Sequence, residues 1–285
     1  MNILITGSKG QLGNEMQLAA ARYPQFNYIY TDIDELDICD KAALEAFVKA
    51  NAVDLIVNCA AYTAVDKAED DVDLCYKINR DAVKNIALVS SANGLKVIHV
   101  STDYVFDGTN YIPYTEDQDV CPATVYGKSK LDGEEVLTAN CKNSVIIRTS
   151  WLYSSFGNNF VKTMIKLGTE RDSLSVIFDQ VGTPTYAADL ADAILKIASA
   201  KSFVPGIYHF SDEGVCSWYD FTKTIHRLCG ITCNVQPIES KDYPARTPRP
   251  HYSVLNKSKI KSTYGIQIPH WEESLIKCIE VLKAK

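Results

Sequence analysis

The sequence predicts an α/β fold: a Rossmann-like, doubly wound parallel sheet with a smaller C-terminal substrate-binding lobe. Two observations support this prediction. Short β-branched runs alternate with helical segments through residues 1–150, and a glycine-rich loop directly follows the first of these runs. Alternation at this spacing is typical of right-handed βαβ units, whose strands lie in a parallel sheet.

The first half of the chain is expected to contain five strands and four helices. The strands are predicted at residues 2–6, 28–32, 54–60, 96–101 and 144–150. The helices between them are predicted at residues 11–22, 41–51, 73–94 and 125–140. The third strand is an apolar run, which favours burial on both faces. Asn93-Gly94 is a helix C-terminal signal.

The second half is less regular and has no clean boundary with the first. Helices are expected at residues 158–168, 187–200, 217–230 and around 271–284, and strands at 173–179 and 206–212. A proline-rich loop spans residues 242–256. We therefore predict a dinucleotide-binding domain at residues 1–150. Residues 151–285 should form mainly the substrate-binding lobe, with some segments returning to the Rossmann core.

Composition narrows the class of protein. The chain has 285 residues, of which 46% are hydrophobic and 22% charged, with a formal net charge of -6. These values exclude a disordered or fibrous chain, and the acidic balance argues against nucleic acid as a partner. The sequence contains neither an apolar run of the ~18 residues that a membrane span needs nor a signal-peptide pattern. The nine widely spaced cysteines favour reduced thiols in a cytoplasmic protein rather than disulfides or a zinc site.

The loop GSKGQLG places Gly7, Gly10 and Gly13 between the first strand and the first helix. Glycines are needed there for a tight turn, for close approach of a pyrophosphate to the backbone, and for close packing of the helix on the sheet. The N–H groups and the dipole of the helix N-terminus then attract the phosphates. The spacing is GxxGxxG rather than GxGxxG. The prediction of a dinucleotide-binding loop therefore depends on the position of the glycines directly after the first strand.

An acidic residue, Asp32, ends the second predicted strand. A carboxylate there accepts hydrogen bonds from the adenosine ribose and repels a 2′-phosphate, which favours NADH over NADPH. Lys9 in the loop acts in the opposite direction, because it could neutralise that phosphate. Asp37 and Ile38 are expected to flank the adenine. Residues 58–63 are mostly small, as a backbone that passes close to a dinucleotide requires.

Tyr126 and Lys130 are four residues apart in YGKSK and share one face of a predicted helix. An ammonium near a phenol stabilises the phenolate, so the pair could act as a general acid or base. Tyr219 and Lys223 repeat the spacing. They lie in the irregular half, where we expect a packing or surface role.

The fourth predicted strand is followed by Thr102, Asp103 and Tyr104. A hydroxyl at this sheet edge can hydrogen-bond a substrate carbonyl alongside Tyr126, and Thr102 is the candidate. Local bonding of Thr102 to the backbone is the plainer alternative.

Together these motifs resemble the extended short-chain dehydrogenase/reductase family. The segments VNCAAYTAVDKAE, VSTDYVFDG, YGKSKLDGE, RTSWLYSSFGNNFVKTM and RPHYSVLN are most similar to its dTDP-4-dehydrorhamnose reductases, over nearly the whole chain. The resemblance implies NADPH or NADH as cofactor and a nucleotide-sugar substrate. It also implies reduction of the C4 ketone of dTDP-4-dehydro-β-L-rhamnose, the last step towards dTDP-L-rhamnose for cell-surface polysaccharide.

The resemblance also assigns roles to residues. Tyr126, Lys130 and Thr102 would be catalytic, with Lys130 on the nicotinamide ribose and Asp32 on the adenosine ribose. Tyr126 would also contact the cofactor, and the other cofactor-binding positions would be Gly7, Gly10, Gln11, Leu12, Gly13, Asp37, Ile38, Ala60, Ala61, Tyr62 and Thr63. The sugar nucleotide would contact Thr102, Asp103, Tyr104 and Trp151. Trp151 could equally be a core aromatic residue.

One departure concerns metal and assembly. Some members dimerise through Mg²⁺ held by glutamates, and Glu15 matches one such ligand. The second position is occupied by Ala188, beside Asp189. No metal site is therefore predicted and bound Mg²⁺ is doubtful, while a homodimer remains open.

Two other functions stay open. A dehydratase or epimerase of the same family would keep the fold, but dehydratases place Asp-Glu after the threonine, whereas this chain has Asp103-Tyr104. A non-catalytic cofactor-binding subunit, like the regulatory β subunit of methionine adenosyltransferase, is the third hypothesis. Retention of Thr102, Tyr126 and Lys130 argues against it.

Overall fold

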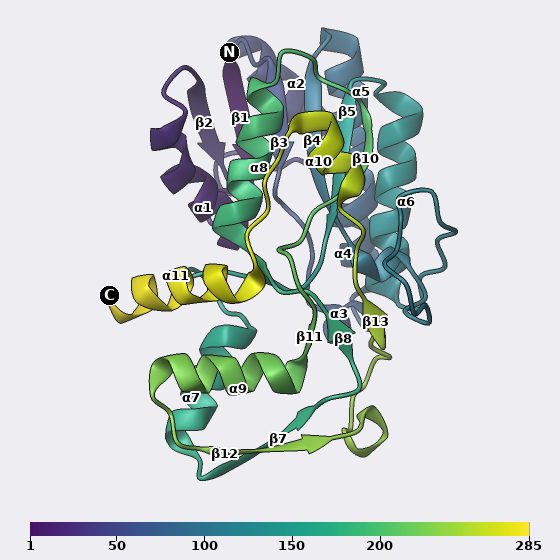
Figure 1. Cartoon of the computed structure of the whole chain (residues 1–285). Helices are drawn as coiled ribbons and strands as arrows, with labels where there is room; N and C mark the ends of the chain where they lie inside the picture. The colour runs from purple at the N-terminus through teal and green to yellow at the C-terminus, as the bar shows by residue number, and fades with distance from the viewer. Residues whose placement is uncertain (285) are drawn as a thin grey trace.

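The computed structural model describes residues 1–284, and its centre is one six-stranded sheet. The strands are β1 (Asn2–Thr6), β2 (Asn27–Thr31), β3 (Leu55–Asn58), β4 (Lys96–Thr102), β5 (Ser144–Thr149) and β10 (Gly206–His209). They lie in the order β2-β1-β3-β4-β5-β10, and every neighbouring pair is parallel (Figure 1). The predicted doubly wound α/β fold is confirmed.

Helices cover both faces of this sheet because alternate strand residues point to opposite sides. On β1, Ile3 and Ile5 belong to the core beneath α1 (Gln11–Ala19) and α8 (Ala187–Ser199). Leu4 points into the opposite core. Three helices cover that side, namely α2 (Lys41–Ala50), α5 (Ala82–Asn93) and α6 (Val125–Asn140).

The order of the strands reverses between β1 and β3, and this is where a doubly wound sheet opens a ligand crevice at the carboxyl ends of its strands. The glycine loop follows β1, and Cys59, Ala60 and Ala61 follow β3. The strand predicted at 54–60 therefore ends at Asn58, and its last residues form part of the crevice.

The helix predicted at 73–94 is interrupted. It consists of α4 (Val72–Tyr76), a π-helical turn (Lys77–Asp81) and α5. The wide turn places the Asn79 side chain between two elements, where it donates to Ser129 Oγ (3.0 Å) and accepts from Tyr62 N (2.9 Å). A Cβ at Gly133 would lie 2.2 Å from Asn79 O, so α6 approaches the turn closely only because it has glycine there.

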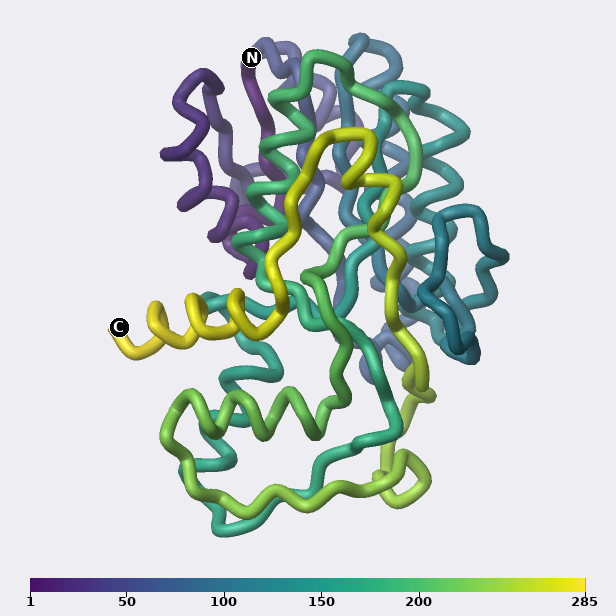
Figure 2. Tube along the Cα trace, in the orientation of Figure 1, coloured from purple at the N-terminus to yellow at the C-terminus, as the bar shows by residue number. Residues whose placement is uncertain are grey.

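The second half builds a smaller lobe with its own apolar core (Figure 1). Its main elements are α7 (Phe160–Glu170), β7 (Ser173–Ile177), α9 (Trp218–Cys229), β12 (Asn234–Ile238) and α11 (Trp271–Lys283). β7 and β12 pair in parallel, although β12 has no counterpart among the predicted elements. Other segments of this half return to the large sheet: β10 extends it beside β5, and α8 packs on α1. Figure 2 shows the chain crossing several times between the two parts.

Several short elements were also not expected from the sequence. They are α3 (Val65–Ala68), β6 (Leu152–Tyr153), β8 (Val181–Gly182), β9 (Thr185–Tyr186), β11 (Cys216–Ser217), β13 (Tyr252–Ser253), α10 (Ser258–Tyr264) and four single 3₁₀ turns or π turns at 20–22, 77–81, 103–105 and 240–242. Among the helices within residues 1–284, none has the length and apolarity needed to cross a bilayer.

Candidate active site

The glycine loop adopts the conformation that dinucleotide binding requires. Gly7 has a φ of +64°, and a Cβ there would lie 2.7 Å from Ala60 Cα. A Cβ at Gly13 would lie 2.3 Å from Gly7 O, so the first turn of α1 can sit against the loop only as glycine. Gly10 is the residue before α1 and has no side chain to cap the first N–H groups of that helix. These groups are therefore available to an anion.

A cavity of about 460 Å³ opens beside this loop. It brings together half of the predicted cofactor residues: its lining includes Gly7, Gly10, Asp32, Asp37, Ile38, Ala60 and Ala61. The shape and the free helix N-terminus fit the adenosine and pyrophosphate half of a dinucleotide.

The acidic end of this cavity is fixed by the backbone. Asp32 accepts from Lys9 N (3.0 Å) through Oδ2 and from Ile33 N (2.9 Å) through Oδ1. The ammonium of Lys9 is bound instead by Asp34 (3.0 Å) and Glu35 (2.8 Å). Asp32 thus lines the cavity, while the Lys9 ammonium is shared between two other acids.

The remaining predicted cofactor residues lie around the cavity rather than in its lining. Gln11 starts α1 and accepts from Asn159 Nδ2 (3.0 Å), while Leu12 and Gly13 are buried under the loop. Tyr62 packs near Tyr126, and its hydroxyl donates to Asp71 (2.9 Å). Thr63 is exposed.

Tyr126 occupies the first turn of α6, directly beyond the edge of β4. The helix begins there because Thr124 Oγ1 accepts from Gly127 N (3.0 Å). The ring of Tyr126 meets that of Tyr104 edge to face, with centroids 5.5 Å apart. Burial raises the pKa of the Tyr126 phenol, and a hydrogen bond with the Thr102 hydroxyl partly opposes this effect. The phenol is therefore protonated at neutral pH.

Lys130 lies one turn further along α6 and is 1% exposed. Its Nζ donates to Val100 O (2.7 Å) and lies 3.2 Å from His99 Nε2, so the end of the Lys130 side chain is held by β4. Burial lowers the pKa of Lys130 to about 8, and the charge of Glu134 partly opposes the shift. Lys130 was expected to lower the pKa of the Tyr126 phenol directly. Burial is the largest cause of the shift in that pKa, and Lys130 is not among its main causes.

Thr102 and Asp103 end β4 next to Tyr126. Thr102 Oγ1 donates to Asp103 Oδ1 (3.0 Å) and accepts from Tyr104 N (3.2 Å). The Thr102 hydroxyl therefore forms hydrogen bonds with its neighbours in the chain, as the plainer alternative expected. Burial raises the pKa of Asp103 to about 6. Thr102, Asp103 and Tyr126 thus form one buried polar group.

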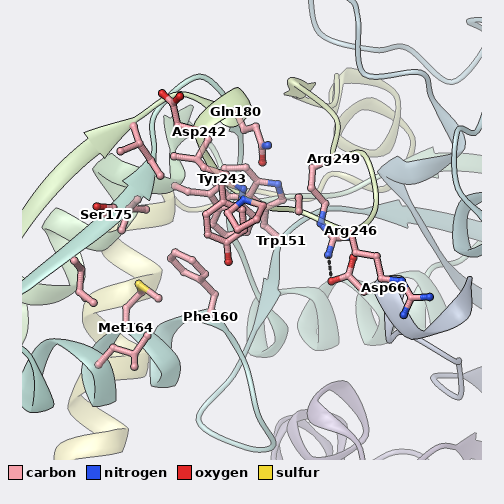
Figure 3. A pocket seen from close by; sticks show the side chains of 18 of the residues that line it. Asp66, Trp151, Phe160, Met164, Ser175, Gln180, Asp242, Tyr243, Arg246 and Arg249 are labelled. Atoms are coloured by element: carbon pink, nitrogen blue, oxygen red, sulfur yellow. Dashed lines mark hydrogen bonds and ion pairs between the residues drawn. The ribbon is translucent and has the colours of Figure 1, made fainter.

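A larger cavity of about 820 Å³ lies between this group and the small lobe. Tyr104 and Trp151, two of the residues predicted to contact the sugar nucleotide, line it. Trp151 has a left-handed backbone, with a φ of +48°, and its indole stacks on that of Trp218. Figure 3 shows Trp151, Phe160 and Tyr243 gathered around the hollow.

Sequence reasoning missed several residues of this cavity. Phe160 and Trp218 supply apolar wall, and Arg246 and Arg249 supply positive charge. Arg249 pairs with Asp66 (2.6 Å; Figure 3), and Arg246 pairs with Asp70. The two arginines belong to the proline-rich loop, and their clustering in ARTPRP was the signal that could have identified them.

The metal and the second tyrosine–lysine pair can also be placed. Glu15 is 3% exposed and accepts from Ser154 Oγ (2.5 Å), whereas Asp189 accepts from Ser274 Oγ (2.5 Å). Within residues 1–284, no group of three or more His, Cys, Asp or Glu side chains could hold a metal.

The second tyrosine–lysine pair lies in the small lobe. Tyr219 packs against the core of that lobe, and Lys223 is exposed on α9, away from β4.

The doubly wound sheet, the glycine loop and the Tyr126–Lys130 helix define a dinucleotide-binding oxidoreductase class. The family model described as the RmlD substrate binding domain matches residues 1–284, and the chain belongs to this family. A crystal structure titled dTDP-4-dehydrorhamnose reductase from Clostridium acetobutylicum superposes with a TM-score of 0.95 at 44% identity, covering 99% of this chain and 100% of that one.

Two further relatives are similarly close. A dTDP-4-dehydrorhamnose reductase from Bacillus anthracis, solved in complex with NADP, gives a TM-score of 0.94 at 38% identity and covers 98% of this chain and 99% of that one. The spore coat polysaccharide biosynthesis protein SpsK of Bacillus subtilis is 42% identical, over 96% of this chain and 95% of its own. The predicted family is confirmed.

Proposed function

We propose that this protein reduces the C4 ketone of dTDP-4-dehydro-β-L-rhamnose to give dTDP-L-rhamnose, with NADPH or NADH as cofactor. The observation that carries the proposal is the buried Tyr126–Thr102 pair on α6 and β4, beside a cavity lined by Trp151 and the glycine-loop cavity. Relatives at about the same length carry the reductase name. Residues 1–150 would bind mainly the cofactor and residues from 151 onward mainly the sugar nucleotide.

Each residue has a part in this reaction. When bound, the reduced nicotinamide supplies the hydride. Tyr126 donates its phenolic proton to the oxygen of the reduced ketone, and its raised pKa keeps that proton in place until the oxygen becomes basic. Thr102 orients the same oxygen through its hydroxyl. Lys130 binds the nicotinamide ribose with the Nζ position that Val100 and His99 leave free.

The cofactor site fits either nicotinamide cofactor at its pyrophosphate end, because the uncapped N–H groups of α1 suit the pyrophosphate that NADH and NADPH share. Asp32 favours NADH because it lines the cavity and Lys9 is engaged elsewhere. We place the enzyme in the cytoplasm, where nucleotide sugars are made. We assign it no resident Mg²⁺, because Glu15 and Asp189 are already bonded to serines.

The test is a reaction of the purified protein with dTDP-4-dehydrorhamnose and either NADH or NADPH. Loss of the near-ultraviolet absorbance of the reduced nicotinamide, one equivalent for each dTDP-rhamnose formed, is the expected result. A dehydratase or epimerase would recycle the cofactor, so product without net loss of absorbance would contradict the proposal. Cofactor binding without any turnover would favour the regulatory subunit instead.

A further inference from the structure

A chain of buried polar side chains runs beneath the candidate active site, from β1 to α6. Thr6 Oγ1 donates to Asn58 Oδ1 (2.7 Å), and Asn58 Nδ2 lies 3.0 Å from His99 Nδ1. His99 Nε2 in turn lies 3.2 Å from Lys130 Nζ. None of the four residues is more than 1% exposed, so their polar side-chain atoms need hydrogen-bond partners within the protein.

The orientation of the Asn58 amide follows from the backbone. Ala60 N donates to Asn58 Oδ1 (3.2 Å), and a backbone N–H can only donate. Oδ1 therefore accepts from both Ala60 and Thr6, which leaves Nδ2 to donate towards His99. His99 Nδ1 must accept that bond with its lone pair.

This bond decides where His99 carries its proton. The ring is fully buried, and burial is the main reason why its pKa lies well below the usual range, so the ring is neutral also when Lys130 is uncharged. A neutral imidazole with a bare Nδ1 carries its hydrogen on Nε2. That N–H points at Lys130 Nζ, which can accept it only as an uncharged amine.

The ammonium form of Lys130 needs a different arrangement. It has no lone pair, so His99 Nε2 must be bare and the proton must move to Nδ1. The Asn58 amide must then rotate to accept from Nδ1, and it gives up its bonds from Ala60 and Thr6. Two nearby groups favour the charged form of Lys130 over the amine. They are the Glu134 carboxylate on α6 and the Cys75 thiol on α4.

We propose that His99, oriented by Asn58, is a positioning residue that sets the protonation state of Lys130 by donating from Nε2 to the amine. The proposal rests on the proposed function only in that Lys130 contacts the cofactor there. In consequence, gain of one proton by Lys130 from solvent is coupled to the tautomer of His99 and to rotation of the Asn58 amide. The orientation of the Asn58 amide, at the carboxyl end of β3 beside the cofactor crevice, would thus depend on the charge of Lys130.

The first test needs neither turnover nor a variant. In the cofactor-free protein, ¹⁵N NMR of the imidazole above the pKa of Lys130 is expected to show His99 protonated on Nε2 and bare on Nδ1. The ¹³Cε signal of Lys130, followed with pH, should titrate together with a switch of His99 to the Nδ1–H form. An Nδ1–H tautomer throughout the titration would overturn the proposal.

The second test uses the sign of a shift. His99→Leu removes the donor to the amine, so the Lys130 titration should move to higher pH by about one unit, a tenfold change in proton affinity. If His99 instead accepted from the ammonium, the same variant would move it to lower pH. An unchanged titration would mean that His99 only fills space in the core and has no effect on the protonation of Lys130. Either result would contradict the proposal.

A matched pair of variants isolates the amide. Asn58→Asp can only accept from His99, so it should impose the Nδ1–H tautomer and raise the pH at which Lys130 titrates. Thr6→Val keeps the Ala60 bond that orients the amide and should leave the tautomer unchanged. An Nε2–H tautomer in Asn58→Asp, or a switched one in Thr6→Val, would refute the relay. Absence of reductase turnover would leave these spectra intact, so the two proposals fail separately.

Discussion

The indole of Trp151 lies flat on that of Trp218, with ring centroids 3.4 Å apart and planes 8° from parallel. Trp151 lies just after β5, between β5 and β6, and Trp218 starts α9, so the stack joins the carboxyl end of the sheet to the small lobe. The left-handed φ of Trp151 directs the ring into the larger cavity, a strained geometry that clusters at functional sites. The stack therefore forms a wall of the proposed substrate site.

Gly182→Ala should disturb this wall. A Cβ there would lie 2.7 Å from Trp151 Cε2, so the indole must move. We expect KM for the sugar nucleotide to rise about tenfold, a loss of roughly 1.4 kcal/mol of binding. The NADH dissociation constant, measured by fluorescence titration, should stay within about twofold. Equal weakening of both ligands would indicate general unfolding rather than displacement of Trp151.

Asp32→Ser should change the choice between cofactors. The substitution removes the carboxylate that repels a 2′-phosphate, while Lys9 stays at the cavity, paired with Asp34 and Glu35. The ratio of kcat/KM for NADPH to that for NADH should rise by about tenfold. Glu45→Gln on α2 removes one negative charge outside the cavity and serves as the control. A ratio that moves equally in both variants would assign the preference to net charge alone.

Glu134→Ala should reduce stability strongly. The Glu134 carboxylate binds Arg148 at 2.7 Å, and both side chains are at most 3% exposed. Removal of one partner leaves a buried guanidinium uncompensated, so the free energy of unfolding should fall by about 3–5 kcal/mol in urea denaturation. Glu45→Ala removes an exposed i,i+4 partner of Lys49, and its loss should stay within ~0.5 kcal/mol. Comparable losses would mean that the buried pair contributes no more than a surface pair.

The repeating strand–helix pattern determined how much of the fold could be predicted. β1, α2, α6 and β5 lie within one or two residues of their expected bounds, because each combines an apolar pattern with a clear cap or turn. The π turn at Lys77–Asp81 was not visible, since the local sequence is helical throughout and the widening depends on contacts of Asn79 with distant elements. β12 contains Pro237, which weakens a strand pattern, yet it pairs at an edge beside β7.

The candidate site shows the same division. Gly7 and Asp32 directly follow strands, Thr102 ends β4, and Tyr126 lies in the first turn of the helix that comes after β4. These residues could be chosen because such positions meet at one edge of the sheet. Trp218 and Arg249 are far from that edge in the sequence and reach the cavity only through packing of the small lobe. His99 lies inside an apolar strand, where nothing in the sequence distinguishes it from a packing residue.

The central claim is that Tyr126 is the proton donor of a reductase, and the second YxxxK sequence supplies the matched control. Turnover of dTDP-4-dehydrorhamnose should be compared in Tyr126→Phe and Tyr219→Phe, with NADH affinity measured in both. We expect Tyr126→Phe to lower kcat by about 10²-fold or more with cofactor binding nearly intact, and Tyr219→Phe to keep most of the activity. Near-normal turnover in Tyr126→Phe would contradict the account.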